Sequence, residues 1–365
     1  MKVGIVTWHR GNIGSSLQAY ALSEILKNLG YEPEILNMIR FKAMPALRRM
    51  KNCAFRACFC RSGITRDNTN KFVKAHLKES SNLLYEEIRE YSKDFGAVIC
   101  GSDQIWSCVD EVNPFYFLQF ADERKRISYA PSIGLNGIKK EFRADFAKYV
   151  SSIPYLSVRE TKGAEIIRDL TGLVPEVVLD PTLLLRREDW EKLAQEATIE
   201  RFGLQPGSYI LCYFLGDIKR YEAYLDSITM MIGKKVVFVS TQKVNLGRNQ
   251  VTCTVEEFLA LIHGSYCVLT DSFHGTILSL NMEKKVAVFE RFTADDPLNQ
   301  NSRIYNILQR LGIENWLTSP QKSATAFIDR TDDWNAIRSV LCSERTKSLK
   351  YLERSLNCVI AESLS

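Results

Sequence analysis

The segment Thr270–Thr276 holds the residues of this chain whose types and spacing are best suited to chemistry. It reads Thr-Asp-Ser-Phe-His-Gly-Thr, follows an apolar run and opens a helical pattern. Backbone N–H groups at a helix N-terminus bind anions, and a glycine lets a ligand come close to the backbone. We therefore expect a phosphate site formed by Asp271, Ser272, His274, Gly275 and Thr276. In the alternative interpretation, Asp271 or Ser272 only caps the helix and His274 packs inside the fold.

A second candidate site is the block Gly101–Trp106, which follows the apolar run Ala97–Cys100. Polar groups beside an aromatic plane suit a sugar, which has hydroxyls on its edge and C–H groups on its face. Asp103, Gln104 and Trp106 are therefore candidate sugar-binding residues. The alternative is a capped loop with a buried tryptophan.

The N-terminal loop His9–Ser16 also joins a strand-like segment to a helix-like one. Its glycines do not have the spacing of a dinucleotide-binding loop. Asn12 and Gly14 are its candidate ligand contacts, and an ordinary turn with glycine punctuation is the alternative.

Arg159 stands at the end of another apolar run, in the block Ser157–Glu160. The planar fork of a guanidinium matches the oxygens of a carboxylate or a phosphate, so Arg159 is a candidate contact for an anionic substrate. A surface ion pair with Glu160 or Asp180 is the alternative.

Apolar runs that alternate with helical segments predict parallel sheets. The strands expected in the first half are 3–7, 34–37, 97–100, 127–130, 155–158 and 177–179, with a helix at 15–29. The strands expected in the second half are 209–214, 236–239, 267–270 and 286–289, with helices at 186–199, 221–231, 255–263, 276–282 and 304–311. We expect an α/β protein with two doubly wound Rossmann-like domains, 1–185 and 186–365, that face one another across a cleft in a GT-B-like arrangement. Ligands of such sheets lie outside the carboxyl ends of the strands, where the candidate residues fall.

The composition supports a folded protein of more than one domain. The chain has 365 residues, of which 45% are hydrophobic and 25% charged, and single cores rarely organise more than about 250–300 residues. A net charge of +5 is too small to indicate nucleic-acid binding. The N-terminus lacks the pattern of a secretion signal and no run reaches the roughly 18–20 apolar residues of a membrane span, so we expect a cytoplasmic protein.

Two local features concern metals and membranes. The cysteines Cys53, Cys58 and Cys60 cluster without the second ligand pair of a zinc site, so we expect free thiols and no metal. The run Arg40–Arg66 has eight basic residues, no acidic residue and apolar residues at helical spacing. It predicts peripheral contact with an anionic membrane, at the inner face of the cytoplasmic membrane. A solvated helix packed on its own domain is the alternative.

Six blocks taken together resemble the polysaccharide pyruvyl transferases. They occur in the family's order over about residues 1–310. The blocks are Asn12-Ile13-Gly14 with Leu17–Leu22, Gly101–Trp106, Ser128-Tyr129-Ala130, Ser157–Glu160, Asp180–Leu184 and Asp271–Thr276. No single block is decisive, but their order is specific.

The resemblance implies a GT-B-like fold, phosphoenolpyruvate as co-substrate without a further cofactor or metal, and a glycan or lipid-linked glycan as acceptor. Such a reaction belongs to the building of exopolysaccharide or capsule in the cell envelope. In the family, the equivalents of His274 and Arg159 are associated with phosphoenolpyruvate. Some branches have arginine where this chain has Ser272, so the phosphate contact must come from Ser272, from backbone N–H groups, or from Arg291 or Arg303.

We therefore expect a transferase that places a pyruvate ketal on a sugar, with the acceptor on the domain 1–185 and phosphoenolpyruvate on the domain 186–365. His274 is the expected general acid or phosphate ligand, and Asp103 or His9 the residue that orients or deprotonates the sugar hydroxyl. We expect His274→Gln and Arg159→Ala each to abolish most turnover while leaving the fold intact. The alternatives are a GT-B glycosyltransferase that uses a nucleotide sugar and a glycan-binding protein without catalysis, since fold alone does not separate these functions.

Overall fold

The chain forms two compact units. The computed structural model describes residues 1–39, 63–195, 197–239 and 249–364. The first unit comprises Met1–Ile133, Gly137–Pro181 and Lys347–Ser365, and the second comprises Gly134–Asn136 and Thr182–Thr346. Each unit is built around its own parallel sheet.

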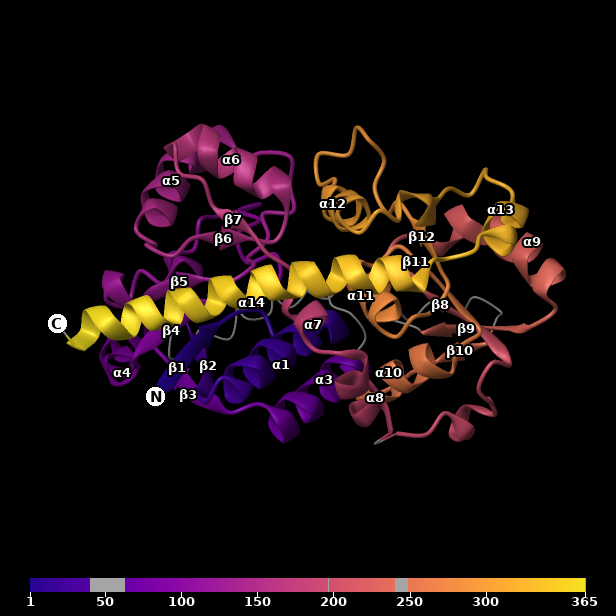
Figure 1. Cartoon of the computed structure of the whole chain (residues 1–365), viewed down its shortest axis with the longest axis horizontal. Helices are drawn as coiled ribbons and strands as arrows, with labels where there is room; N and C mark the ends of the chain where they lie inside the picture. The colour runs from indigo at the N-terminus through magenta and orange to yellow at the C-terminus, as the bar shows by residue number, and fades with distance from the viewer. Residues whose placement is uncertain (40–62, 196, 240–248, 365) are drawn as a thin grey trace, which may run out of the picture. The chain divides into compact units, whose positions relative to one another are not determined.

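The first unit contains a five-stranded parallel sheet in the order β3-β2-β1-β4-β5 and a separate pair of short parallel strands, β6 and β7 (Figure 1). The strands are β1 (Lys2–Val6), β2 (Glu32–Met38), β3 (Glu79–Leu83), β4 (Ala97–Cys100), β5 (Arg126–Ser128), β6 (Ser157–Val158) and β7 (Glu176–Val177). Its helices are α1 (Ile13–Asn28), α3 (Gly63–His76), α4 (Tyr85–Tyr91), α5 (Arg143–Ser151) and α6 (Thr161–Thr171). The strands expected at 155–158 and 177–179 are thus found, but in the small second sheet.

The strand order reverses direction between β1 and β4. The chain moves outward from β1 to β2 and β3, then returns to add β4 on the other side of β1. Ile5 is aligned with Ile35 of β2 and with Ile99 of β4, and all three are buried. At the carboxyl edge, the loop after β1 leads toward β2 and the loop after β4 leads toward β5, on opposite sides. The position between β1 and β4 is therefore a topological switch point, where open α/β sheets bind ligands.

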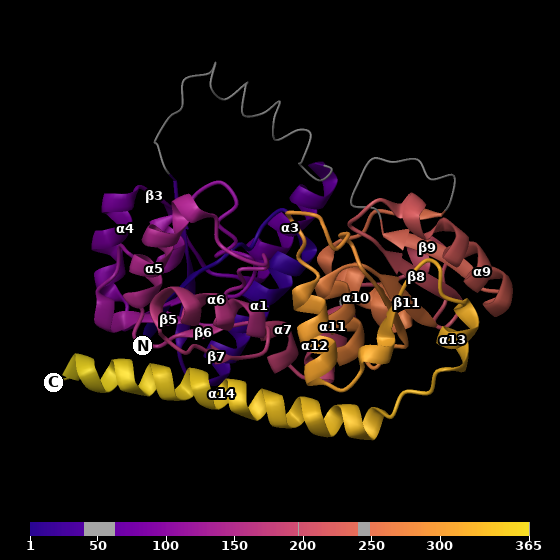
Figure 2. The same cartoon turned by 90° about the horizontal axis from the view of Figure 1, so that it is seen from above.

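Helix α1 starts directly beyond this switch point. Asn12 is its N-cap, and its side chain accepts a hydrogen bond from the Gly14 N–H. The helix ends before Gly30, whose φ of +84° lies in the left-handed region that glycine adopts without strain. Helix α1 packs against α3, and the two lie side by side in Figures 1 and 2.

The second unit repeats the same topology with one more strand. Its parallel sheet has the order β10-β9-β8-β11-β12-β13, and its switch point lies between β8 and β11. The strands are β8 (Tyr209–Tyr213), β9 (Lys235–Val239), β10 (Gln250–Val251), β11 (Cys267–Thr270), β12 (Val286–Phe289) and β13 (Leu317–Thr318). The helices are α7 (Pro181–Leu184), α8 (Arg187–Gln195), α9 (Glu222–Ile232), α10 (Val255–Gly264), α11 (Phe273–Asn281), α12 (Ser302–Arg310) and α13 (Ala324–Asp329), with the short 3₁₀ helix η6 at Ile218–Tyr221.

Helices cover both faces of the second sheet. In Figure 1, α9 and α13 lie above the strands, whereas α8 and α10 lie below them, and the members of each pair pack together. The central strands β8, β11 and β12 are buried along their whole length, as strands covered on both faces should be. The expected α/β class and parallel sheets are therefore confirmed.

The C-terminal helix α14 (Trp334–Leu364) belongs to both units. Its first part buries Ile337 and Leu341. From Lys347 onward it packs on the first unit, where Ser348 Oγ accepts a hydrogen bond from Leu179 N–H and Tyr351 Oη donates one to Ser128 O. The expected domain 186–365 included this segment, and the boundary observed between Pro181 and Thr182 also lies a few residues earlier than expected. A helix that packs on two units cannot be assigned to one of them by position in the sequence.

Some sequence features fall outside the described residues. These include Cys53, Cys58, Cys60 and most of the basic run Arg40–Arg66. Within the described ranges, no group of three or more His, Cys, Asp or Glu residues is arranged to hold a metal ion. None of the helices in the described part of the chain combines the length and the apolar character that crossing a bilayer would need.

Candidate functional site

In the second unit, Asp271 ties the loop after β8 to the loop after β11. Its carboxylate accepts hydrogen bonds from Leu215 N–H at 2.7 Å and Gly216 N–H at 2.8 Å. Burial and the neighbouring Asp271 carboxylate raise the pKa of Tyr221, so its hydroxyl stays protonated and donates to Asp271 at 3.2 Å. A Cβ at Gly216 would lie 2.8 Å from Asp271 Oδ2, so glycine is required there by close approach. Asp271 therefore shapes the switch point, as a buried carboxylate that is already satisfied by the protein.

Ser272 is the N-cap of α11. Its hydroxyl accepts from Gly275 N–H at 3.2 Å, and Thr276 Oγ1 donates to Ser272 O at 2.9 Å. A Cβ at Gly275 would lie 2.6 Å from Thr270 Oγ1 and 3.0 Å from Tyr213 Cδ1. The expectation that Gly275 leaves room for a ligand is thus corrected, because the missing side chain lets α11 pack against β8 and β11. Capping by Ser272, the alternative interpretation, is also observed.

His274 lies in the first turn of α11 and is 7% exposed. Its ring packs edge-on against Phe273, the first residue of α11. Helix α11 follows the carboxyl end of β11 at the switch point. The helix dipole favours an anion at this end. His274 is thus held on a rigid element at the edge where ligands of such sheets bind.

Arg291 and Arg303 are the two cations expected near this helix. Arg291 lies beside Asp271, with its Nε 3.8 Å from Asp271 Oδ1 and its Nη2 donating to Asp271 O at 3.2 Å. Arg303 is buried over the Phe273 ring, at 5.8 Å from the ring centroid, and donates to Gln300. Arg291 is 20% exposed in its side chain and so remains more accessible to a ligand than Arg303.

In the first unit, Ser15 and Asp103 join the two loops at the switch point. Ser15 Oγ donates to Asp103 Oδ2 at 2.5 Å, although 88 residues separate them. Asp103 is 5% exposed, and its φ of +70° is unusual for a residue with a side chain. Its other carboxylate oxygen accepts from Gln104 N–H at 2.9 Å. Backbone strain of this kind is a reason to test a residue for function, and Asp103 remains a candidate site residue.

A buried ion pair lies beneath this edge. Arg159 Nη1 donates to Asp180 Oδ2 at 2.7 Å, and the two side chains are 2% and 0% exposed. Ser102 Oγ donates to the same Asp180 oxygen at 2.7 Å. Glu160 accepts from the Ser132 hydroxyl and from Ile133 N–H, both at 3.0 Å. The ion pair with Asp180 considered as the alternative is therefore present, in the core and not on the surface.

Trp106 is not available to a sugar. The ring is fully buried, stacks on Phe117 with centroids 5.1 Å apart, and donates its indole N–H to Tyr116 O at 3.0 Å. The expected sugar contact is corrected, since both faces of this ring are covered by protein. Gln104, in contrast, is half-buried, and its amide nitrogen has no hydrogen-bond partner among the described residues.

His9 is engaged through both ring nitrogens. Nδ1 lies 3.1 Å from Thr7 O and Nε2 lies 2.9 Å from Glu79 Oε1. Burial raises the pKa of Glu79, but hydrogen bonds from His9, Arg10 and Asn37 outweigh burial and lower this pKa to about 2. His9 is thus part of a charged network that holds the N-terminal loop against β3.

Sequence reasoning missed several residues of these clusters. Thr7 Oγ1 donates to Ser102 O at 2.7 Å, and Gln18 Nε2 donates to Trp8 O at 2.6 Å. Ser15 and Ser102 were also overlooked as partners of carboxylates. The signal in the sequence was the group of polar residues Ser15, Ser16 and Gln18 at the start of α1. All three are buried in the structure, and fully buried polar side chains require hydrogen-bond partners.

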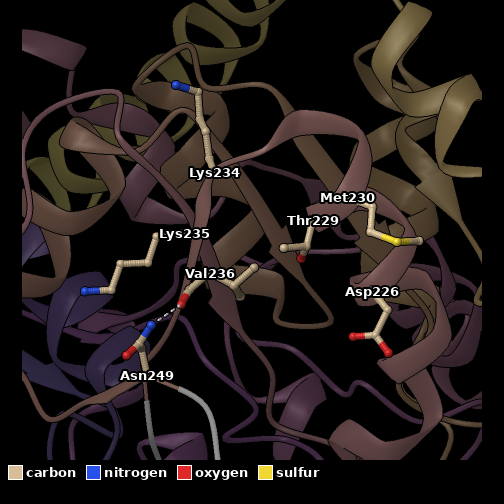
Figure 3. Close-up of a pocket in the computed structure, with 7 residues that line it drawn as sticks. All are labelled: Asp226, Thr229, Met230, Lys234, Lys235, Val236 and Asn249. Carbon is tan, nitrogen blue, oxygen red and sulfur yellow. Dashed lines mark hydrogen bonds between the residues drawn. The ribbon is translucent and has the colours of Figure 1, made fainter.

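The pocket drawn in Figure 3 lies at the amino ends of strands in the second sheet, whereas the candidate site lies at the carboxyl ends. It has a volume of about 460 Å³ and is lined by Asp226, Thr229, Met230, Lys234, Lys235, Val236 and Asn249. Lys235 begins β9, so the pocket opens at the amino ends of the strands. His274 and Asp271 follow the carboxyl end of β11, and the pocket is therefore separate from the candidate site.

Comparison with solved structures supports the fold. UDP-GlcNAc 2-epimerase from Neisseria meningitidis, bound to UDP-GlcNAc, is 11% identical with a TM-score of 0.51 over 95% of this chain and 100% of that one. The enzyme from Methanocaldococcus jannaschii, in complex with UDP-GlcNAc and UDP, is 14% identical with a TM-score of 0.51 over 98% and 99%. A putative UDP-N-acetylglucosamine 2-epimerase from Listeria monocytogenes is 11% identical with a TM-score of 0.52 over 96% and 90%. At these identities the similarity shows the GT-B-like fold alone.

Comparison of sequences identifies the family. No curated protein sequence matches the chain. The model of the polysaccharide pyruvyl transferase family matches residues 12–291, which include every candidate residue discussed above except His9 and Arg303. The match contains the switch point of the second sheet and, at that of the first sheet, β4 and α1, whereas β1 precedes it. The chain therefore belongs to the polysaccharide pyruvyl transferase family.

Proposed function

We propose that this protein transfers pyruvate from phosphoenolpyruvate to a sugar of a glycan, forming a ketal and releasing phosphate. The family supports the general class, a transferase. The observation that carries the proposal is the position of His274, a titratable side chain in the first turn of a helix that leaves the switch point of its sheet. An anion and a proton donor can meet there.

The reaction has simple requirements. Protonation of the phosphoenolpyruvate methylene carbon makes its C2 cationic, and a sugar hydroxyl adds to C2. The C2–O bond to phosphate then breaks, and a neighbouring hydroxyl closes the ketal. Of the two hydroxyl protons lost, one is balanced by the proton in the new methyl group and the other by the proton on phosphate. The protein must supply an acid, an orienting group for the acceptor and cations for the donor.

Roles toward the donor are proposed for His274, Arg291 and Arg159. We assign His274 as general acid or phosphate ligand. Arg291 is the proposed cation in place of the arginine that some relatives have at Ser272, because its side chain is adjacent to Asp271 and partly exposed. Arg159 remains the proposed contact for a carboxylate or phosphate oxygen, and Asp180 orients its guanidinium.

Asp103 is the proposed orienting group for the sugar hydroxyl. Ser15 holds one carboxylate oxygen and the Gln104 N–H holds the other, so the side chain has a fixed position. His9 is a weaker candidate because Thr7 and Glu79 engage both of its nitrogens. Asn12 is the N-cap of α1 and Gly14 lies in its first turn, beside Ser15. The Gln104 amide nitrogen is buried and has no hydrogen-bond partner among the described residues.

The acceptor and the cellular location rest on sequence alone. We propose a glycan or lipid-linked glycan acceptor and a cytoplasmic protein whose segment Arg40–Arg66 contacts an anionic membrane. We also propose that the reaction requires no metal or further cofactor. Activity that survives EDTA supports this last point, and activity lost to EDTA and restored by a divalent cation contradicts it.

A donor panel tests the function. The protein is incubated with candidate glycans and either phosphoenolpyruvate or nucleotide sugars, and phosphate release and acceptor mass are measured. Phosphate released only when a glycan is present, together with a pyruvate ketal on that glycan, supports the proposal. Glycosyl transfer from a nucleotide sugar overturns it, and so does sugar binding without turnover of any donor.

A further inference from the structure

Trp8 is an exposed tryptophan at the switch point of the first sheet. It lies two residues beyond the end of β1, and 39% of it is exposed. Of the five tryptophans in the chain, Trp106, Trp190 and Trp316 are fully buried and Trp334 is half-buried. Isolated exposed apolar residues are common, so exposure alone assigns no role to Trp8.

The backbone around Trp8 is held on both sides. Thr7 is buried and donates to Ser102 O, and His9 is buried with both ring nitrogens engaged. Gln18 Nε2 donates to the carbonyl of Trp8 itself at 2.6 Å. The indole is therefore displayed from a fixed segment, which reduces the conformational entropy lost when a ligand packs against it.

A second aromatic ring supports the indole from one edge. The Tyr116 ring meets the Trp8 ring at 83° with centroids 6.3 Å apart. Trp106 fixes the Tyr116 backbone, since its indole N–H donates to the Tyr116 carbonyl. An edge-on neighbour steadies the ring while it covers only part of its surface. The buried Trp106 thus positions the aromatic pair whose exposed member is Trp8.

We propose that Trp8 is the platform on which a pyranose ring of the acceptor stacks. The inference rests on the proposed function in taking the acceptor to be a sugar. A pyranose presents C–H groups to an aromatic face and hydroxyls to polar groups around it. The loop after β4, which neighbours β1, holds two polar side chains of this kind, Asp103 and Gln104. Asp103 is 5% exposed, and the Gln104 amide nitrogen is a buried donor with no partner in the described ranges, so it has hydrogen-bonding capacity that the protein leaves unused.

Sugar binding without phosphoenolpyruvate tests this platform separately from catalysis. Saturation-transfer NMR measures binding of lactose, cellobiose, mannobiose and N,N′-diacetylchitobiose to the wild type, Trp8→Phe and Trp8→Ala. We expect at least one of these sugars to receive saturation at its ring C–H protons from the wild type. Trp8→Ala should weaken that binding roughly two- to tenfold, the range expected for a lost stacking contact, and Trp8→Phe less.

Two controls make the result specific. Tyr266→Ala removes an aromatic residue that is 50% exposed on the second unit, and it should leave sugar binding unchanged. Circular dichroism should show that Trp8→Ala is folded. Equal binding by folded Trp8→Ala and wild type overturns the platform, as does a wild type that binds none of the four sugars. Sugar binding that depends on Trp8 without any phosphoenolpyruvate turnover supports the platform and counts against the proposed function alone.

Discussion

Arg159 and Asp180 form an ion pair of 2.7 Å in which neither side chain is more than 2% exposed. Arg159→Ala leaves the Asp180 carboxylate buried without its charge partner, and breaking such pairs typically costs about 3–5 kcal/mol. We therefore expect Arg159→Ala to lower the free energy of unfolding strongly, in contrast to the sequence-based expectation of an intact fold. Urea denaturation measures this loss.

The control for this prediction is an exposed pair on α6. Arg168 and Asp169 are 58% and 71% exposed, with Arg168 Nε 3.7 Å from Asp169 Oδ1. Arg168→Ala should cost less than about 1 kcal/mol. Equal losses for the two variants would show that burial of the Arg159 pair has no energetic consequence. Arg159→Lys, which keeps the charge, separates stability from substrate contact, because a raised KM for phosphoenolpyruvate in a stable variant supports the contact.

Gly275 should tolerate no side chain. In Gly275→Ala the new methyl group meets Thr270 Oγ1 at 2.6 Å and Tyr213 Cδ1 at 3.0 Å, so α11 must shift. We expect a loss of about 1–3 kcal/mol, as for other overpacked sites, and lower activity because His274 moves with the helix. Gly137→Ala, where nothing lies within 4 Å of the new Cβ, is the control. Similar thermal unfolding of the two variants would contradict the packing account.

The network of Glu79 predicts a dependence of stability on pH. The pKa of Glu79 is lowered to about 2 in the folded protein, from 4.5 in a model compound. A lowered pKa adds stability above pH 4.5 that is lost as the pH falls toward 2. The free energy of unfolding should therefore fall more steeply across this interval in the wild type than in Glu79→Gln. Parallel pH profiles of urea denaturation for the two proteins would show that the network does not stabilise the fold.

The basic run Arg40–Arg66 predicts binding to anionic lipid. At low salt, the protein should sediment with vesicles that contain phosphatidylglycerol and not with pure phosphatidylcholine vesicles. Replacing the eight basic residues by glutamine should abolish sedimentation. Binding that survives this replacement would show that another part of the protein contacts the membrane. Absence of binding by the wild type would contradict membrane contact altogether.

The sheets were predictable from the sequence because parallel strands buried on both faces read as continuous apolar runs. The strands Ala97–Cys100, Cys267–Thr270 and Val286–Phe289 were predicted with their observed bounds. Helix α14 was missed although its buried residues recur at helical spacing from Ile337 to Val359. Ser348 and Ser355 lie on this buried face, so the apolar pattern in the sequence is interrupted.

The candidate site was predictable in position and only partly in contacts. Residues that follow strands can be assigned to the carboxyl edge from the sequence, and Asp103 and His274 lie there. The pairing of Ser15 with Asp103 joins residues far apart in the chain, which local patterns do not reveal. Local sequence also does not distinguish a buried tryptophan from an exposed one, which is why Trp106 was chosen and Trp8 was not.

The central claim is that His274 takes part in pyruvyl transfer, and the steady-state kinetics of His274→Gln test it most directly. Glutamine can still hydrogen-bond but cannot deliver a proton at neutral pH, so kcat for phosphate release from phosphoenolpyruvate should fall roughly a hundred- to ten-thousand-fold. The control is His263→Gln, which changes a histidine 46% exposed at the end of α10 and should leave kcat unchanged. Circular dichroism on the same preparations should show that both variants are folded. A folded His274→Gln enzyme that retains more than about a tenth of the wild-type kcat would contradict the account.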